Sequence, residues 1–185
     1  MKRTSLLLLL AIAAGGACAA ERPLIAAKSE IGFMVKQMGV GVSGAFKRYS
    51  AKVNLDPAKP ESASAEIEVD IASISTGTDE GDQTAVDKPW LDAADFAKAR
   101  FKSSAVRALG GDKYEVKGTL TIRGKPRELT IPLTLKTGSD GVTVATGEFT
   151  VRRTDFGVGG GEWNEGDLVA NEVLVHFRLT LGASR

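Results

Sequence analysis

The chain has 185 residues, with 24 Lys and Arg against 23 Asp and Glu, one histidine and one cysteine. This near-neutral balance gives no support for nucleic acid as a partner, because domains that bind nucleic acid carry an excess of basic residues. With a single cysteine, an intramolecular disulfide is excluded.

The first twenty residues are typical of a secretory signal peptide. Lys2 and Arg3 precede an apolar run from Leu6 to Ala14, and small residues follow as far as Ala20. The run is too short to span a bilayer, which takes about 20 apolar residues. We therefore expect residues 1–20 to direct export and residues 21–185 to form one periplasmic domain.

Cys18 lies inside this leader. An acylated lipoprotein cysteine is usually preceded by a larger aliphatic residue three positions earlier, whereas this sequence has Gly15 there. Cys18 is therefore interpreted as a small residue near the cleavage site, and lipoprotein anchoring through it is not expected.

Alternation of apolar and polar residues predicts strands along most of the remaining chain. The first runs from Ser29 to Val35. The following segment has the spacing G-x-G-x-x-G from Gly39 to Gly44, but it keeps a two-residue apolar period, which favours a strand over a dinucleotide site. Short strands are also expected at 51–56 and 63–74. In the latter, three carboxylates share one face, which we interpret as solvated surface: Glu66, Glu68 and Asp70.

Residues 75–88 show no sustained apolar period and are expected to form a loop. The segment 87–97 then changes character, because its apolar residues approach helical spacing. Asp87 is expected to cap this short helix, with Pro89 in its first turn. The helix would cover the end of an apolar interior or pack against the sheet.

The clearest strand pattern is a hairpin over 114–135, with a turn at Arg123–Pro126. Pro132 lacks an N–H, which indicates an edge, a bulge or a splayed end in the second strand. Strands at 142–151 and 172–181 follow, separated by a glycine-rich segment at 157–161 that is expected to be flexible. Eight to ten strands with one short helix predict an all-β antiparallel barrel or sandwich.

Reactive groups are sparse in this pattern. His176 is the single histidine and lies on the polar face of the last strand, so no Ser-His-Asp triad or metal site is indicated. Arg152 and Arg153 point to opposite faces, and the inward one is expected to pair with Asp155 or another acid, or else to meet a ligand headgroup. The sequence favours binding over catalysis. It leaves open whether the interior is filled or holds a small ligand.

The chain resembles the YceI-like periplasmic family, which is described as binding polyisoprenoids or lipids inside a lipocalin-like barrel. The matching pieces are Ser29-x-Ile-x-Phe33, Gly44-x-Phe46, Asp56-Pro57, Ile71-x-Ser-Ile-Ser-Thr-Gly77, Trp90-Leu91, Ala99-Arg-Phe101, Gly118-x-Leu-Thr-Ile-Arg-Gly124 and Arg152-Arg-x-Asp-Phe-Gly157. Many members carry Arg-Asp and His-Leu in the loop before the helix, whereas this chain has Gly81-Asp-Gln-Thr-Ala-Val86. Roles tied to those residues are therefore not carried over to this chain.

The resemblance implies an antiparallel barrel of roughly eight strands that holds the apolar chain of an isoprenoid or a quinone tail. It also implies candidate lining positions, which are Phe33, Phe46, Ile71, Trp90, Leu91, Phe101, Leu120, Ile122 and Phe156. Beyond the bound lipid, no cofactor is expected.

Gly161-Glu-Trp163 resembles a branch of the family that occurs fused to membrane cytochrome b domains. The alternative function is therefore a filled barrel that acts as an interaction module for a membrane redox protein. The oligomeric state stays open, with a homodimer among the options. An unrecognised hydrolase or isomerase would require a pocket with a perturbed acid or arginine.

Overall fold

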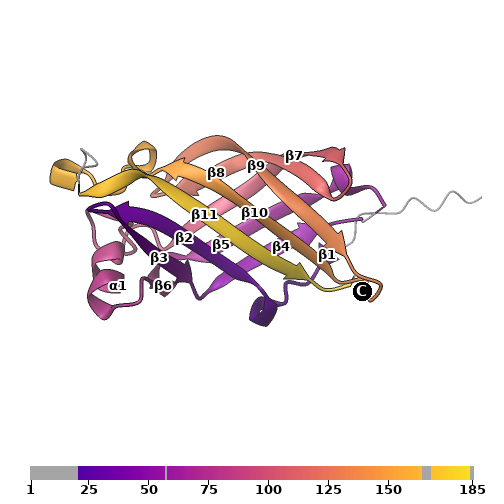
Figure 1. The fold of residues 1–185 in the computed structure, drawn as a ribbon, viewed down its shortest axis with the longest axis horizontal. Coiled ribbons are helices and arrows are strands. Elements are labelled where there is room, and N and C mark those ends of the chain that lie inside the picture. The colour runs from indigo at the N-terminus through magenta and orange to yellow at the C-terminus, as the bar shows by residue number, and fades with distance from the viewer. Residues whose placement is uncertain (1–20, 57, 164–167, 184–185) are drawn as a thin grey trace, which may run out of the picture.

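The computed structural model describes residues 21–56, 58–163 and 168–183, and its fold is all-β with one α-helix (Figure 1). The expected signal peptide lies outside these residues. The strands are β1 (Glu21–Arg22), β2 (Glu30–Gln37), β3 (Val40–Phe46), β4 (Tyr49–Asn54), β5 (Ser64–Asp70), β6 (Ile74–Ser75), β7 (Lys98–Gly110), β8 (Lys113–Ile122), β9 (Lys125–Thr137), β10 (Thr143–Arg152) and β11 (Val169–Leu181). The helix is α1 (Asp79–Val86), and the short 3₁₀ turns are η1 (Ala26–Lys28), η2 (Pro60–Ser62), η3 (Ile71–Ser73), η4 (Arg153–Phe156) and η5 (Gly161–Trp163).

The strands form one antiparallel sheet in the order β1-β4-β5-β7-β8-β9-β10-β11-β2-β3-β6. The sheet curls on itself in a lipocalin-like manner (Figure 1). Its eleven strands exceed the expected eight to ten because β1 and β6 are only two residues long. Among the described residues, no helix is both long and apolar enough to cross a membrane.

Two junctions bring the ends of the curled sheet together. β3 pairs with β2, and the chain turns at Lys47 and Arg48 into β4, which pairs with β5. At the other end, Leu24 bridges to Leu181, and the N–H of Gly182 donates to the carbonyl of Pro23 at 2.8 Å. These two connections join the two flanks of the sheet, as an enclosed interior requires.

Arg22 forms hydrogen bonds that join several segments at the end of the sheet where both described termini lie. It is 5% exposed, and its guanidinium donates to the carbonyls of Leu55 at 3.0 Å and Gly141 at 2.8 Å, and to the hydroxyl of Thr143 at 3.1 Å. These bonds tie β1 to the chain after β4 and to the turn before β10. A buried cation is tolerated where such acceptors surround it.

The predicted central hairpin is confirmed as β8 and β9, with Val116 opposite Ile131. Its turn is tighter than expected. Arg123 and Gly124 have φ of 49° and 68°, the positive values that two-residue hairpin turns adopt. Pro126, expected in the turn, lies inside β9 and pairs with Thr121.

Pro132 marks a splayed end, one of the three predicted options. β9 pairs with β10 only from Thr137 to Leu133, opposite Thr143 to Gly147. Before Leu133, β9 pairs with β8 alone. The two strands therefore separate at Pro132.

The helix prediction was wrong in position. Residues 79–86, expected as a loop, form α1, and residues 87–97 form successive turns and a short link to β7. The side chain of Thr78 caps α1 by accepting from Gly81 N–H, and Asp82 accepts from Thr76 N–H at 2.5 Å. Local caps and first-turn acids stabilise this helix without an apolar stripe. Asp87, expected at an N-terminus, is instead the residue that ends α1.

Candidate functional site

An apolar cavity with a volume of about 210 Å³ lies inside the curled sheet. Its wall is built by β2, β3, β4, β5, β7, β8, β9, β10 and β11, with the chain around Leu91 at one end and Leu55 at the other. The surface that the wall presents to the cavity is entirely apolar. Apolar cavities of about 150 Å³ stay dry and bind small hydrocarbons. Side chains therefore do not fill this interior, and its apolar surface suits a hydrocarbon ligand.

Strand alternation explains why the wall is apolar. Phe101 on β7 lies opposite Leu120 on β8, and both face inward. The preceding residue on β7, Arg100, faces outward and pairs on the outer surface with Glu68 at 2.8 Å. Successive side chains of a strand point to opposite faces, so inward apolar residues and outward charges follow from one pattern.

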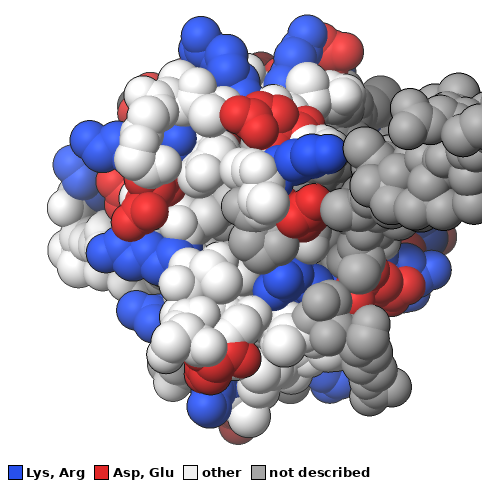
Figure 2. All heavy atoms as spheres, turned by 90° about the vertical axis from the view of Figure 1, so that its right-hand side faces the viewer, with Lys and Arg blue, Asp and Glu red and all other residues white. Residues whose placement is uncertain are grey.

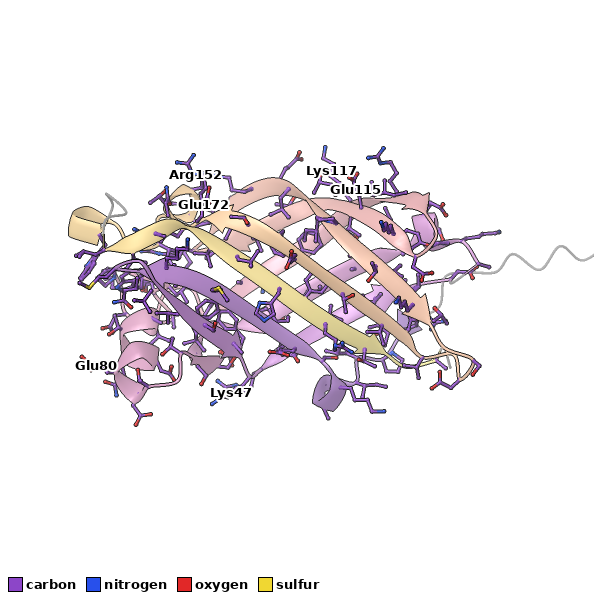
Figure 3. The ribbon with its side chains drawn as sticks, viewed as in Figure 1. Lys47, Glu80, Glu115, Lys117, Arg152 and Glu172 are labelled. Atoms are coloured by element: carbon purple, nitrogen blue, oxygen red, sulfur yellow. The ribbon has the colours of Figure 1, made fainter. Side chains whose placement is uncertain are left out.

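The outer surface carries charges of both signs. Figure 2 shows acidic and basic side chains interspersed around the end of the sheet where β1 lies. In Figure 3, Glu115 and Lys117 of β8 project away from the interior. The carboxylates of 63–74 lie on this outer surface, where Glu68 and Asp70 form ion pairs. That arrangement agrees with their interpretation as a solvated face.

The nine candidate lining residues divide into two groups. Six of them lie along the cavity wall, which are Phe46, Ile71, Leu91, Phe101, Leu120 and Ile122. Contact with a ligand remains a prediction for all six. Leu91 lines the wall although the helix predicted at 87–97 does not form. The turns after α1 hold it there, with the N–H of Leu91 donating to the carbonyl of Ala85 at 3.0 Å.

The other three candidates lie outside the cavity wall. Phe33 is half-buried and packs against Phe46 with the rings tilted and their centroids 5.8 Å apart, in the space left by Gly44 on the neighbouring strand. Trp90 packs on Trp163 at 5.7 Å, away from the cavity. Phe156 is 2% exposed within η4, where it belongs to the packing after β10.

More than half of the wall comes from positions that were not singled out. They include residues of the last strands and of the end near Arg22, which are Val53, Leu55, Ile131, Leu133, Leu135, Ala145, Phe149, Val175, Phe177, Leu179 and Leu181. Their inward face was readable from the two-residue apolar period. The two-residue period does not predict the order of the strands, and that order is what brings these residues around a single cavity.

Arg153 is the buried arginine of the pair 152–153, and its partners correct the sequence interpretation. Its guanidinium donates to five carbonyl oxygens rather than to Asp155, and these belong to Val158, Gly159, Trp163, Val169 and Ala170. Asp155 is exposed. The carbonyls of the glycine-rich segment, expected to be flexible, are thus held by a buried cation whose pKa is lowered by burial.

The residues with shifted pKa lie away from the cavity surface. Hydrogen bonding to Lys98 lowers the pKa of Glu68, and Arg48 lowers that of Asp70. Both carboxylates face outward, and Arg153 is not in the cavity wall. Within the part of the chain that the structure describes, no group of three His, Cys, Asp or Glu side chains could hold a metal ion. The site offers burial of an apolar molecule and presents no acid or base to it.

The curled antiparallel sheet and its apolar interior place the protein among the lipocalin-like β-barrels. The YceI-like domain family matches residues 24–181, and the chain belongs to that family.

A UPF0312 protein from Pseudomonas savastanoi pv. phaseolicola is 31% identical over 136 residues, which cover 70% of this chain and 71% of that protein. The crystal structure of BcnA from Burkholderia cenocepacia is similar with a TM-score of 0.82 and 39% identity, covering 85% of this chain and 98% of BcnA. A polyisoprenoid binding domain from Saccharophagus degradans, implicated in plant cell wall breakdown, shares the fold with a TM-score of 0.71 at 19% identity. That match covers 89% of this chain and 99% of the domain.

Proposed function

We propose that this protein binds the hydrocarbon chain of an isoprenoid, or of a similar long-chain lipid, inside the curled sheet. The observation that carries the proposal is the cavity of about 210 Å³ with a wholly apolar surface. Burial of each methylene group contributes about 0.8 kcal/mol, so a long chain can be held by apolar burial alone. A quinone with an isoprenoid tail falls in the same chemical class.

The family and the fold support this class of ligand. The Saccharophagus degradans domain is described as polyisoprenoid binding, and it has the same fold as this chain. At 19% identity that likeness concerns the fold alone, so the ligand of the present protein rests on its own cavity. The wall exposes no polar atom to the cavity, which favours a binding role over acid–base or nucleophilic chemistry.

A binding protein of this kind fits a role in sequestering or carrying lipid in the periplasm. The proposal of a periplasmic location rests on the signal-like residues 1–20, with Lys2 and Arg3 before an apolar run. The aqueous periplasm is a compartment in which a lipid chain needs protein cover. The alternative of a filled barrel is less well supported, because a filled interior would lack a cavity of this size.

Uptake of a defined isoprenoid tests the proposal. Geranylgeraniol is titrated into the full-length protein, and bound lipid is followed by native mass spectrometry. We expect the wild type to bind one or more molecules and Ile122→Trp to lose binding, because the indole would project into the cavity that Ile122 lines.

The control is Thr121→Trp, which places the same side chain on the opposite face of β8. It should leave binding unchanged. Equal uptake by wild type and Ile122→Trp, or none by the wild type, would contradict the proposal. Unfolding curves of both variants show whether any loss of binding comes from loss of the fold.

A further inference from the structure

The ladder between β9 and β10 stops halfway along both strands. The last pair is Leu133 with Gly147. Beyond it β9 continues back to Lys125 paired only with β8, and β10 continues forward to Arg152 paired only with β11. Residues 125–132 and 148–152 therefore face each other across an interval in which these two strands exchange no backbone pairs.

Two prolines lie in the unpaired part of β9, and Pro132 stands where the pairing with β10 stops. In an antiparallel sheet the N–H and C=O of one residue point to the same neighbour, and the next residue points to the other. The N–H of Leu135 donates to the carbonyl of Asp112, just before β8. The backbone N–H and C=O groups of odd-numbered β9 residues therefore point toward β8. The backbone groups of even-numbered residues point toward β10, and among these residues Pro126 and Pro132 have no N–H to donate.

The interval leads directly to the cavity. Ile131 of β9 and Phe149 of β10 both line the cavity wall. Leu129 packs in the same apolar cluster as Phe149. No backbone pair joins β9 to β10 in this part of the wall, so its side chains can rotate aside without breaking a hydrogen bond between the two strands. Parting a fully paired ladder would break several at once.

Arg127 bridges the end of the interval that lies away from Pro132. Its Nη2 donates to the carbonyl oxygen of Asp155 at 2.7 Å, in the turn that directly follows β10. Its Nη1 donates to the carbonyl oxygen of Pro126 at 2.9 Å. The side chain is exposed, so water can readily replace these bonds. Arg127 thus ties β9 to η4 with a contact that opens easily.

A second early end of a ladder, between β5 and β7, is better closed. Pairing stops there at Glu66 with Lys102. The hydroxyl of Ser103 continues the contact by accepting from the N–H of Ala65 at 2.8 Å, and η2 packs against β7 beside it. The β9–β10 interval has no comparable bond between its two strands among those that the structure describes.

We propose that this interval is a side portal through which a lipid chain enters and leaves the cavity, with Arg127 as its latch. The side portal consists of residues 125–132 and 148–152. The inference rests on the proposed lipid binding and adds the route to it. A portal of this kind controls the rate of exchange and leaves the affinity for the lipid unchanged, because it acts on the barrier and not on the bound state.

Cross-linking the portal tests the route. Extending the register places Thr130 opposite Thr150, both exposed on the outer surface. The variant Thr130→Cys with Thr150→Cys is made in the full chain with Cys18→Ser, so that the introduced pair carries the only thiols. A short bifunctional thiol reagent then bridges the strands. Uptake and release of dansyl-tagged geranylgeraniol are followed by fluorescence before and after bridging.

The matched control locks the same two strands where they are already paired. Thr134 and Thr146 lie opposite each other with hydroxyl oxygens 2.6 Å apart, and both are changed to Cys and bridged in the same way. We expect the Thr130–Thr150 bridge to slow uptake and release about tenfold or more, equivalent to about 1.4 kcal/mol in the barrier. The Thr134–Thr146 bridge should leave both rates unchanged.

A second variant acts in the opposite direction and does not depend on cross-linking. Arg127→Met removes the latch, so both rates should rise while the dissociation constant stays the same. Equal rates in the bridged, unbridged and Arg127→Met proteins would overturn the portal while leaving lipid binding intact. Failure of the wild type to bind the dansyl-tagged lipid at all would overturn the proposed function and the portal together.

Discussion

The guanidinium of Arg153 lies over the indole ring of Trp90, with its central carbon 5.7 Å from the ring centroid. The same guanidinium donates to the carbonyl oxygens of Trp163 and Val169. One side chain thus joins the turns after α1 to η5 and to the start of β11. This contact organises the end of the sheet that carries α1 and the side portal.

Replacing Arg153 tests that role. Arg153→Met keeps an apolar stem but leaves five carbonyl oxygens without their donor. We expect the free energy of unfolding to fall by about 2–5 kcal/mol. Arg152→Met is the matched control, because Arg152 directly precedes Arg153 in the chain but is exposed. It should change the free energy of unfolding by less than about 0.5 kcal/mol. Urea unfolding of the two variants decides the matter, and equal midpoints would contradict the account.

Gly147 lies at the last β9–β10 pair before the two strands separate. A Cβ there would meet the carbonyl oxygen of Pro132 at 2.6 Å and the ring of Phe177 at 2.7 Å. Gly147→Ala should therefore destabilise the fold by about 1–3 kcal/mol, the usual cost of overpacking. Gly41→Ala is the control in strand β3, since its nearest neighbour would be the Met34 sulfur at 3.9 Å. Thermal unfolding of both variants should separate them; a stable Gly147→Ala would argue against the close approach.

Acid should weaken the outer surface through Glu68 and Asp70. Lys98 lowers the pKa of Glu68 from its ordinary 4.5, and Arg48 lowers that of Asp70 from 3.8. A carboxyl whose pKa is lowered on folding stabilises the fold above its ordinary pKa, and this contribution disappears as the pH falls through the folded-state pKa. Stability should thus decline below about pH 4.5.

The Glu68 contribution can be isolated by substitution. Glu68→Gln should lose a small amount of stability at neutral pH and show a shallower decline on acidification, because exposed ion pairs contribute little. Unfolding midpoints of wild type and variant, measured from neutral pH down to about pH 3, provide the comparison. Parallel curves over that range would show that Glu68 is not among the responsible groups.

The strand pattern was predictable because inward and outward residues alternate along each strand. The hairpin of Val116 and Ile131 and the last strand follow from the side-chain period, and proline chemistry narrowed Pro132 to three options, of which the splayed end is observed. The helix was not, because residues 79–86 are mostly polar and are held by Thr78 and Asp82. A Thr before Asp79, Glu80 and Asp82 was the signal that marks its start.

The candidate site was predictable in character but only partly in membership. The family resemblance implied Phe101 and Leu120 as lining residues, and both line the cavity. Leu120 also alternates with polar neighbours in the predicted hairpin. Trp90 and Phe156 are apolar residues outside regular strands, so alternation could not orient them. Their burial beside Arg153 and within η4 depends on contacts between distant segments, which a one-dimensional pattern does not contain.

Native mass spectrometry of the purified protein, before and after extraction with an organic solvent, tests the central claim most directly. Lipid binding in the cavity predicts a discrete added mass that extraction removes and that added geranylgeraniol restores. A protein that is bare before extraction and that also fails to take up geranylgeraniol would contradict the account.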